Sequence, residues 1–202
     1  MGGTEPAREY ALAAMRAGKP FVTANKQLLA QYGDELFQVA RESGVQLRFE
    51  AAVAAVIPIV RTIQEGFAAT EIEKVYGIVN GTTNFILSEM AASGASYDDV
   101  LARAQELGYA EADPTDDVSG ADAAAKMAIL ARLAFHTPVT LSEVSYEGIE
   151  GITPDDLAFA KELGLSLKLL GVAERRGEGI SGVVPSCRLT IGSSGSRFNR
   201  SR

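Results

Sequence analysis

Apolar residues gather along the chain in two kinds of stretch, and these predict helices and strands in alternation. Stretches that begin at a capping residue predict helices at residues 5–17, 25–43, 58–64, 82–92, 96–108, 120–135 and 153–164. Shorter stretches rich in alternating apolar residues predict strands at residues 20–23, 45–49, 71–79 and 165–173. Because the two kinds alternate, we expect an α/β to α+β fold class, with sheet and helices in layers.

Capping residues and glycines mark the expected ends of these helices. We expect Thr4 to cap the first helix and Gly33 to break the second. Ser96 and Asp99 have the spacing of a capping box, and Thr153 precedes another helix. These signals predict compact helical segments joined by short polar loops.

The last part of the chain has a different composition. From Arg176 onward Gly, Ser and Arg dominate, and residues 192–196 are of low complexity. Such a segment has little to bury, so residues 176–202 are expected to be disordered and outside the fold. A functional basic tail is the alternative interpretation.

Composition and charge exclude several classes of protein. The formal net charge of -7 argues against nucleic-acid binding, which needs a basic face. The single cysteine, Cys187, permits no internal disulfide and fits a reduced cytoplasmic setting. The sequence has neither a secretory signal pattern nor an apolar run of about 18 residues, so no membrane partner is expected.

The densest polar cluster lies at residues 111–117 and leads into an alanine-rich helix. Asp122 and Lys126 are four residues apart on that helix and should share one face. An exposed salt bridge is the ordinary explanation of such a pair. The surrounding alanines instead indicate a buried helix, where a lysine beside carboxylates can carry a proton.

Other motifs give weaker signals. A calcium loop that starts at Asp113 fails, because Val118 stands where the sharp-turn glycine is needed. The segment from Asn80 to Asn84 follows a strand and opens a helix, which fits either a ligand-binding turn or a plain turn with threonine as its cap. It does not supply the glycine-rich turn of a dinucleotide-binding unit. His136 is interpreted as a helix C-terminal cap.

Together these motifs resemble the homoserine dehydrogenase family. The resemblance runs from Gly2 to about Ser181 and is strongest in three segments, residues 3–26, 77–87 and 107–126. It implies NAD- or NADP-dependent interconversion of L-homoserine and L-aspartate 4-semialdehyde. Lys126 would then be the general acid/base, and the substrate would be held by Glu111, Asp117 and Asp122. Lys26 and Gly108 would lie against the cofactor.

The resemblance also implies a monovalent cation, usually sodium, in the turn after the second strand. Its ligands would be the backbone oxygens of Glu50, Val53, Ala55 and Ile57. The family usually carries two glycines in this turn, where this chain has Ala55 and Val56. If the second position needs a positive φ, the β-branched Val56 is strained there and adds bulk beside the nicotinamide.

The resemblance implies three segments and a homodimer. Residues 1–25 would be the end of a nucleotide-binding domain, residues 26–175 the catalytic domain, and residues 176–202 an aberrant tail, for which a change of reading frame near residue 182 is one hypothesis. Since the first dinucleotide-binding unit is expected upstream, little turnover is expected from the chain alone. A catalytically silent fragment and a binding module for a small amino acid are the alternatives.

Overall fold

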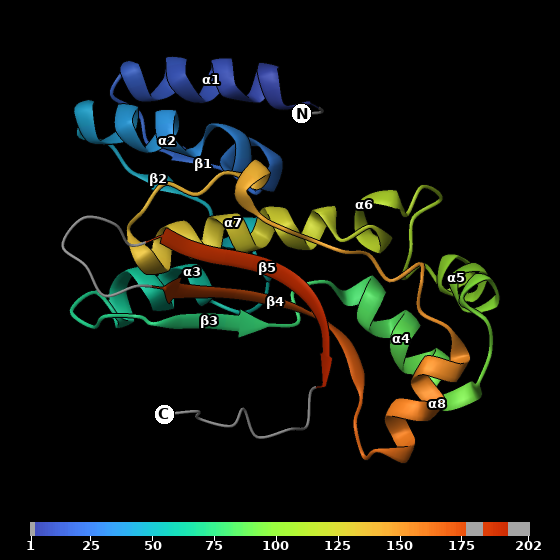
Figure 1. Cartoon of the computed structure of the whole chain (residues 1–202). Helices are drawn as coiled ribbons and strands as arrows, with labels where there is room; N and C mark the ends of the chain where they lie inside the picture. Colours follow the sequence, from blue (N-terminus) through green and yellow to red (C-terminus); the bar gives the residue numbers. More distant parts are fainter. Residues whose placement is uncertain (1–2, 177–183, 194–202) are drawn as a thin grey trace. The chain divides into compact units, whose positions relative to one another are not determined.

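The computed structural model describes residues 3–176 and 184–193, the latter as backbone (Figure 1). The chain divides into two compact units. Unit 1 contains the described residues of Met1–Val75, Ala125–Val144 and Ala173–Cys187. Unit 2 contains those of Tyr76–Ala124, Ser145–Val172 and Arg188–Arg202.

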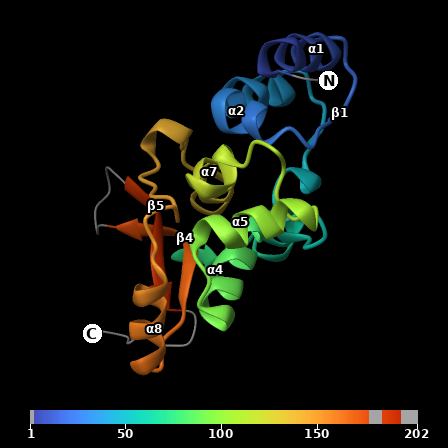
Figure 2. The ribbon, with the colours of Figure 1, turned by 90° about the vertical axis from the view of Figure 1, so that its right-hand side faces the viewer.

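Unit 1 begins with two packed helices and a small parallel sheet. The elements in order are α1 Thr4–Arg16, β1 Phe21–Val22, α2 Lys26–Glu42 and β2 Leu47–Arg48. Strands β1 and β2 pair in parallel, with Phe21 opposite Leu47. Helix α1 lies along α2 in both views (Figures 1 and 2). Their contact is apolar, because the buried side chains include Ala11, Met15, Leu28, Leu29 and Leu36.

The ends of these helices differ in part from the sequence expectation. Gly3, not Thr4, occupies the N-cap position of α1, and its end has no side-chain cap. Asn25 caps α2, and its side chain accepts from the Leu28 amide at 3.0 Å. The expected break at Gly33 is wrong, since α2 runs unbroken through it.

The guanidinium of Arg132 lies against the backbone of α2, which explains why a glycine is found inside this helix. A Cβ at Gly33 would lie 2.8 Å from Nη1 of Arg132, which therefore approaches the α2 backbone closely. Arg132 lies on α7 (Ala121–Phe135) and donates to Asp34 Oδ1 at 2.6 Å. Glycine costs a helix about 1 kcal/mol relative to alanine. Here it leaves room for an ion pair within unit 1.

The remaining elements of unit 1 are short. They are η1 Glu50–Ala52, α3 Ile59–Arg61, the π-helical turn η2 Thr62–Gly66 and η3 Leu141–Glu143. Helix α7 ends at Phe135 and is followed by His136 at φ 52°, a left-handed position typical of a helix end. That geometry agrees with interpreting His136 as part of the helix terminus.

Unit 2 is built around α4. Its helices are α4 Gly81–Ser93, α5 Tyr97–Glu106, α6 Thr115–Val118 and α8 Pro154–Glu162. Helix α4 contacts the other three, and Figure 2 shows α5 and α8 beside it. Ser96 and Thr153 cap α5 and α8 as predicted, each accepting from the amide three residues on. Between the helices predicted at residues 96–108 and 120–135 lies the short helix α6, which the sequence pattern does not reveal.

One three-stranded sheet has the order β3-β4-β5. Its strands are β3 Lys74–Gly77, β4 Leu167–Arg176 and β5 Val184–Ser193. Strand β5 lies in the segment expected to be disordered, and that expectation is wrong for these ten residues. Cys187, Leu189 and Ile191 alternate with polar residues there, a strand pattern that the Gly/Ser composition obscures. The rest of the expected tail, residues 177–183 and 194–202, lies outside the described residues.

Candidate functional site

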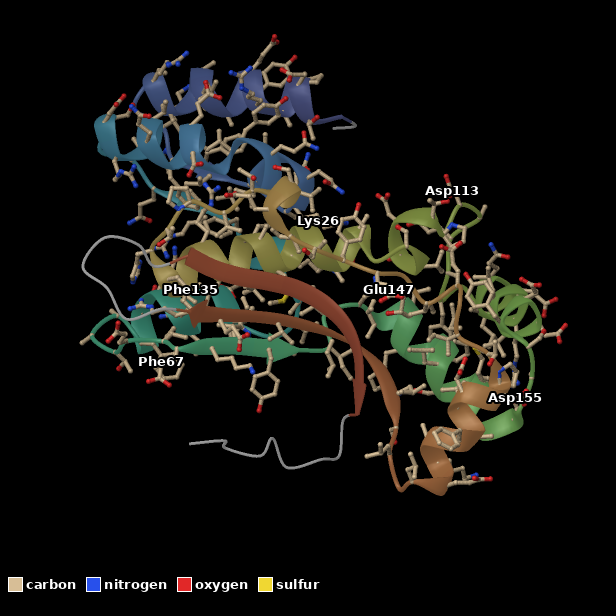
Figure 3. All side chains as sticks on the ribbon, in the orientation of Figure 1. Lys26, Phe67, Asp113, Phe135, Glu147 and Asp155 are labelled. Carbon is tan, nitrogen blue, oxygen red and sulfur yellow. The ribbon has the colours of Figure 1, made fainter. Side chains whose placement is uncertain are left out.

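The acidic loop of unit 2 is held by hydrogen bonds from and to side chains before it reaches α6. Gln105 Nε2 on α5 donates to the carbonyl oxygens of Glu111 and Ala112 at 3.1 and 3.3 Å. Asp113, labelled in Figure 3, accepts from the hydroxyl and amide of Thr115. These two bonds hold the pKa of the Asp113 carboxyl below its ordinary value. Asp113 thus closes the turn that leads into α6, whose N-cap position is occupied by Pro114.

Three side chains from different elements of unit 2 meet through one amide. Asn80 Nδ2 donates to Asp117 Oδ1 at 2.6 Å and to Asp122 Oδ2 at 2.9 Å. Asn80 is 5% exposed and Asp122 is 4% exposed, whereas Asp117 is half-buried. We call Asn80, Asp117 and Asp122 the amide–carboxylate cluster. It joins the first turns of α4 and α7 to α6.

The acid on α7 occupies a favourable place in its helix. Asp122 lies in the first turn, where the free N–H groups and the helix dipole favour a carboxylate. Lys126 follows four residues later on the same helical face, as predicted, and is half-buried. The alanines between them, Ala123 to Ala125, are 0% exposed. The expectation of a buried helix around this pair is confirmed.

Glu111 is placed differently from the two aspartates. It is exposed in the loop between α5 and α6, and only its backbone oxygen takes part in a described hydrogen bond. The structure therefore brings Asp117 and Asp122 together through Asn80 and leaves the Glu111 side chain outside their hydrogen bonds.

The residues expected beside the cofactor are described within their own units. Lys26, labelled in Figure 3, is the first residue of α2 in unit 1 and is half-buried. Gly108 follows α5 in unit 2 at φ 76°, with no atom within 4 Å of where a Cβ would stand. An open backbone position of this kind fits the close approach of a flat ring.

The glycine spacing of a dinucleotide-binding turn does occur once in the chain, at residues 177–182. It stands between β4 and β5 and so precedes a strand, whereas the pyrophosphate-binding turn opens a helix. The segment itself lies outside the described residues, and we assign it no role.

The turn expected to bind a cation has a strained backbone. Positive φ angles fall on Ala54 (54°) and Ala55 (20°), and Val56 is not among the residues with positive φ. The backbone strain expected at Val56 is therefore absent. The Val56 side chain is 95% exposed. The Glu50 carboxylate accepts from the amides of Val60 and Arg61 at 3.0 and 2.9 Å, and so caps α3.

The four proposed cation ligands differ in burial. Val53 is buried, Glu50 is half-buried, and Ala55 and Ile57 are exposed. Among the described residues, no group of three or more His, Cys, Asp or Glu side chains is placed to hold a metal. Any cation in this turn would therefore depend on backbone oxygens.

Asn80 is the member of the cluster that sequence reasoning missed. Its segment fits a plain turn capped by threonine, but the cap is Asn80 itself, whose Oδ1 accepts from the Thr83 amide at 2.8 Å. The available signal was an asparagine between the end of β3 and the first glycine of α4, since asparagine is a preferred N-cap. Nothing in the sequence links it to acids 37 and 42 residues away.

The part of the chain that the structure describes contains no helix long and apolar enough to cross a membrane.

Two family models match this mixed α/β chain, and the first places it among proteins with a nucleotide-binding domain. Residues 1–50 match the model described as "Homoserine dehydrogenase, NAD binding domain". Residues 58–196, which contain the amide–carboxylate cluster and Lys126, match the model described as "Homoserine dehydrogenase". The chain belongs to the homoserine dehydrogenase family.

Relatives and solved structures agree with that assignment. A homoserine dehydrogenase of Bacillus subtilis is 52% identical over 180 residues, which are 89% of this chain and 42% of the relative. One from Pseudomonas aeruginosa is 50% identical over 194 residues, 94% of this chain and 45% of the relative. A crystal structure of a homoserine dehydrogenase from Thiobacillus denitrificans has a TM-score of 0.89 at 50% identity, over 95% of this chain and 43% of that one.

These matches set the extent of the resemblance. The chain spans less than half the length of these relatives. The match also continues to residue 196, further than the end near Ser181 that the motifs indicate.

Proposed function

We propose that this chain is the substrate-binding and proton-transferring part of a homoserine dehydrogenase, which interconverts L-homoserine and L-aspartate 4-semialdehyde with NAD or NADP. The observation that carries the proposal is the amide–carboxylate cluster, one turn from Lys126 on α7, within a chain of this family. Homoserine and the semialdehyde both carry an ammonium group. Paired carboxylates are the side chains that bind such a cation.

The acids hold the substrate. Asp117 and Asp122 receive the ammonium group, and Glu111, exposed on the loop before α6, adds a third carboxylate to the same unit. A fixed ammonium orients the reacting end of this short molecule. Positioning of this kind contributes to rate because the reacting atoms need no further ordering.

Lys126 moves the proton. When the aldehyde is reduced, its oxygen gains negative charge, and the Lys126 ammonium donates a proton to that oxygen. In the oxidation of homoserine the neutral amine of Lys126 takes the hydroxyl proton back. The nicotinamide supplies or accepts the hydride when it is bound, and Lys26 and Gly108 are the residues of this chain that would contact it.

Three finer assignments belong to the same proposal. Backbone oxygens of Glu50, Val53, Ala55 and Ile57 would hold a sodium ion, with Ala55 and Val56 in place of the usual glycines. The protein would act in the cytoplasm as a homodimer. These assignments are supported by the family resemblance alone.

Calorimetric titration with L-homoserine tests the binding half of this proposal. The chain should bind, and Asp122→Ala should weaken binding by about tenfold or more, because one acceptor of the ammonium is removed. Lys161→Ala, an exposed lysine at the end of α8, is the control and should bind normally. Absence of binding by the unaltered chain contradicts the proposed function.

Turnover tests the catalytic half. Loss of NADPH absorbance with aspartate 4-semialdehyde is followed for the chain alone and for the chain joined to the upstream region of the Bacillus subtilis relative. We expect little turnover from the former and clear turnover from the latter. In the joined protein Lys126→Ala should reduce kcat by about 10²-fold or more, with homoserine binding nearly unchanged. A near-normal rate would remove Lys126 from its assigned role.

A further inference from the structure

We propose that Asn80 is a positioning residue that fixes Asp117 and Asp122 at the separation needed to receive the substrate ammonium. This inference rests on the proposed function. Its basis is that one buried amide nitrogen donates to both carboxylates, at 2.6 and 2.9 Å. An amide group has two N–H donors, so this arrangement uses both of them.

The orientation of the Asn80 amide follows from its neighbours. Oδ1 faces the Thr83 backbone amide at 2.8 Å and the Thr83 hydroxyl at 2.9 Å. A backbone N–H can only donate, and ionised carboxylates can only accept. Turning the amide over would set donor against donor and acceptor against acceptor. The nitrogen therefore faces the two acids.

The contacts of its oxygen make Asn80 a rigid support. Asn80 is the N-cap of α4, and Thr83, which donates to it twice, is 0% exposed. Asn80 ties the two acids to the first turn of a packed helix, so their separation is set by the frame of unit 2. The side-chain torsions of the acids alone would leave that separation variable.

Asp117 is supported from its other side as well. The amide of Ile149 donates to the carbonyl oxygen of Val118 at 2.9 Å. A Cβ at Gly148 would lie 2.4 Å from that same oxygen, so only glycine permits this approach. The backbone beside Asp117 is therefore held in place, and Asn80 orients the side chain that projects from it.

The chemistry of the amide suits this role. An arginine or lysine in the place of Asn80 would neutralise one of the acids and compete with the substrate ammonium. A neutral amide brings both carboxylates to one nitrogen and leaves their charge unchanged. Asp117 is half-buried and Asp122 is buried, so a ligand would reach the pair from the side of Asp117.

The test is titration of L-homoserine into the unaltered chain, Asn80→Ala and Ser96→Ala. Asn80→Ala removes the two donors and the cap of α4, and should weaken binding by about tenfold or more. Ser96→Ala removes the equivalent cap of α5, which accepts from the Asp99 amide, and should cost similar stability without changing affinity. Equal affinity of Asn80→Ala and the unaltered chain overturns the positioning role, and so does equal weakening by Ser96→Ala.

A second variant separates positioning from capping. Asn80→Asp keeps an oxygen for the Thr83 amide and loses both donors. An introduced carboxyl can donate again only when protonated, and burial beside two carboxylates raises its pKa. The affinity of this variant for homoserine should therefore rise as the pH falls from about 8 to about 6. The affinity of the unaltered chain should not rise over this range. Parallel pH profiles overturn the proposal, whereas failure of the unaltered chain to bind homoserine overturns the proposed function instead.

Discussion

Among the described residues, a buried side chain in each unit donates to carboxylate oxygen, Arg132 in unit 1 and Asn80 in unit 2, and the two arrangements are built on opposite principles. In unit 1 the guanidinium of Arg132, 8% exposed, donates to Asp34 Oδ1 at 2.6 Å and to the carbonyl oxygen of Val139 at 2.9 Å. In unit 2 the neutral amide of Asn80 donates to two carboxylates. The first group pairs opposite charges, and the second brings like charges together.

Because of that difference, we expect the Arg132 group to contribute to stability and the amide–carboxylate cluster to contribute to ligand binding. Burial lowers the pKa of the Arg132 guanidinium, and Asp34 acts in the opposite direction by favouring its charged form. A buried cation with its partner removed is costly, so the Arg132 group should matter to folding. Like charges held together oppose folding and favour a cationic ligand. Such a trade of stability for function is common at binding sites.

The largest expected effect is in unit 1. Arg132→Leu removes the cation, leaves the Val139 carbonyl without its donor and opens space beside Gly33. We expect a loss of about 2 kcal/mol in the free energy of unfolding, measured by urea denaturation, because a buried carbonyl loses a donor, whereas Asp34 is 56% exposed and stays solvated.

Arg103→Leu is the matched control for that variant. Arg103 makes an ion pair of the same 2.6 Å length with Glu89, but its side chain is 59% exposed. Its loss should cost about 1 kcal/mol or less. Equal losses for the two arginines would mean that burial does not distinguish them.

The next effect concerns Gly33. Gly33→Ala should destabilise the chain by about 1 kcal/mol, because its Cβ meets a guanidinium held by two hydrogen bonds, and this outweighs the gain in helix propensity. In the Arg132→Leu background the same change should instead stabilise by up to about 1 kcal/mol. A double-mutant cycle measures this reversal. The same sign in both backgrounds would remove Arg132 as the reason for the glycine.

Sequence patterns predicted most helices and missed what depends on distant contacts. Ser96 and Thr153 were identified as caps because a cap is a local feature, settled within three residues. Gly33 was interpreted as a break because its partner, Arg132, lies 99 positions further along the chain. Strand β5 was missed because glycine and serine dominate the composition around a short alternating run.

The candidate site also has local features that the sequence predicts and distant contacts that it does not. Asp122 and Lys126 could be placed on one face because helical spacing is local. The bridge from Asn80 to Asp117 and Asp122 could not be predicted, because it depends on the packing of α4 against the segments around α6 and α7. The turn at Ala54 and Ala55 was predicted only in part. Its strain was expected from the missing glycines but was assigned to Val56, and the structure places it on the preceding residues.

The smallest expected effect is the sharpest test of the comparison. Asp117→Asn keeps an oxygen that can accept from Asn80 and removes one of two neighbouring negative charges. We expect the free energy of unfolding to stay unchanged or rise by about 0.5 kcal/mol, with the gain reduced by added salt that screens the repulsion. The same substitution in unit 1, Asp34→Asn, takes the charge opposite Arg132 and should cost about 1 kcal/mol. If both variants destabilise equally, Asp117 makes an attractive contribution like that of Asp34, and the two groups do not differ in principle. If only Asp34→Asn destabilises the chain, then repulsion between Asp117 and Asp122 lowers the stability of the amide–carboxylate cluster, and a bound cation can offset that repulsion.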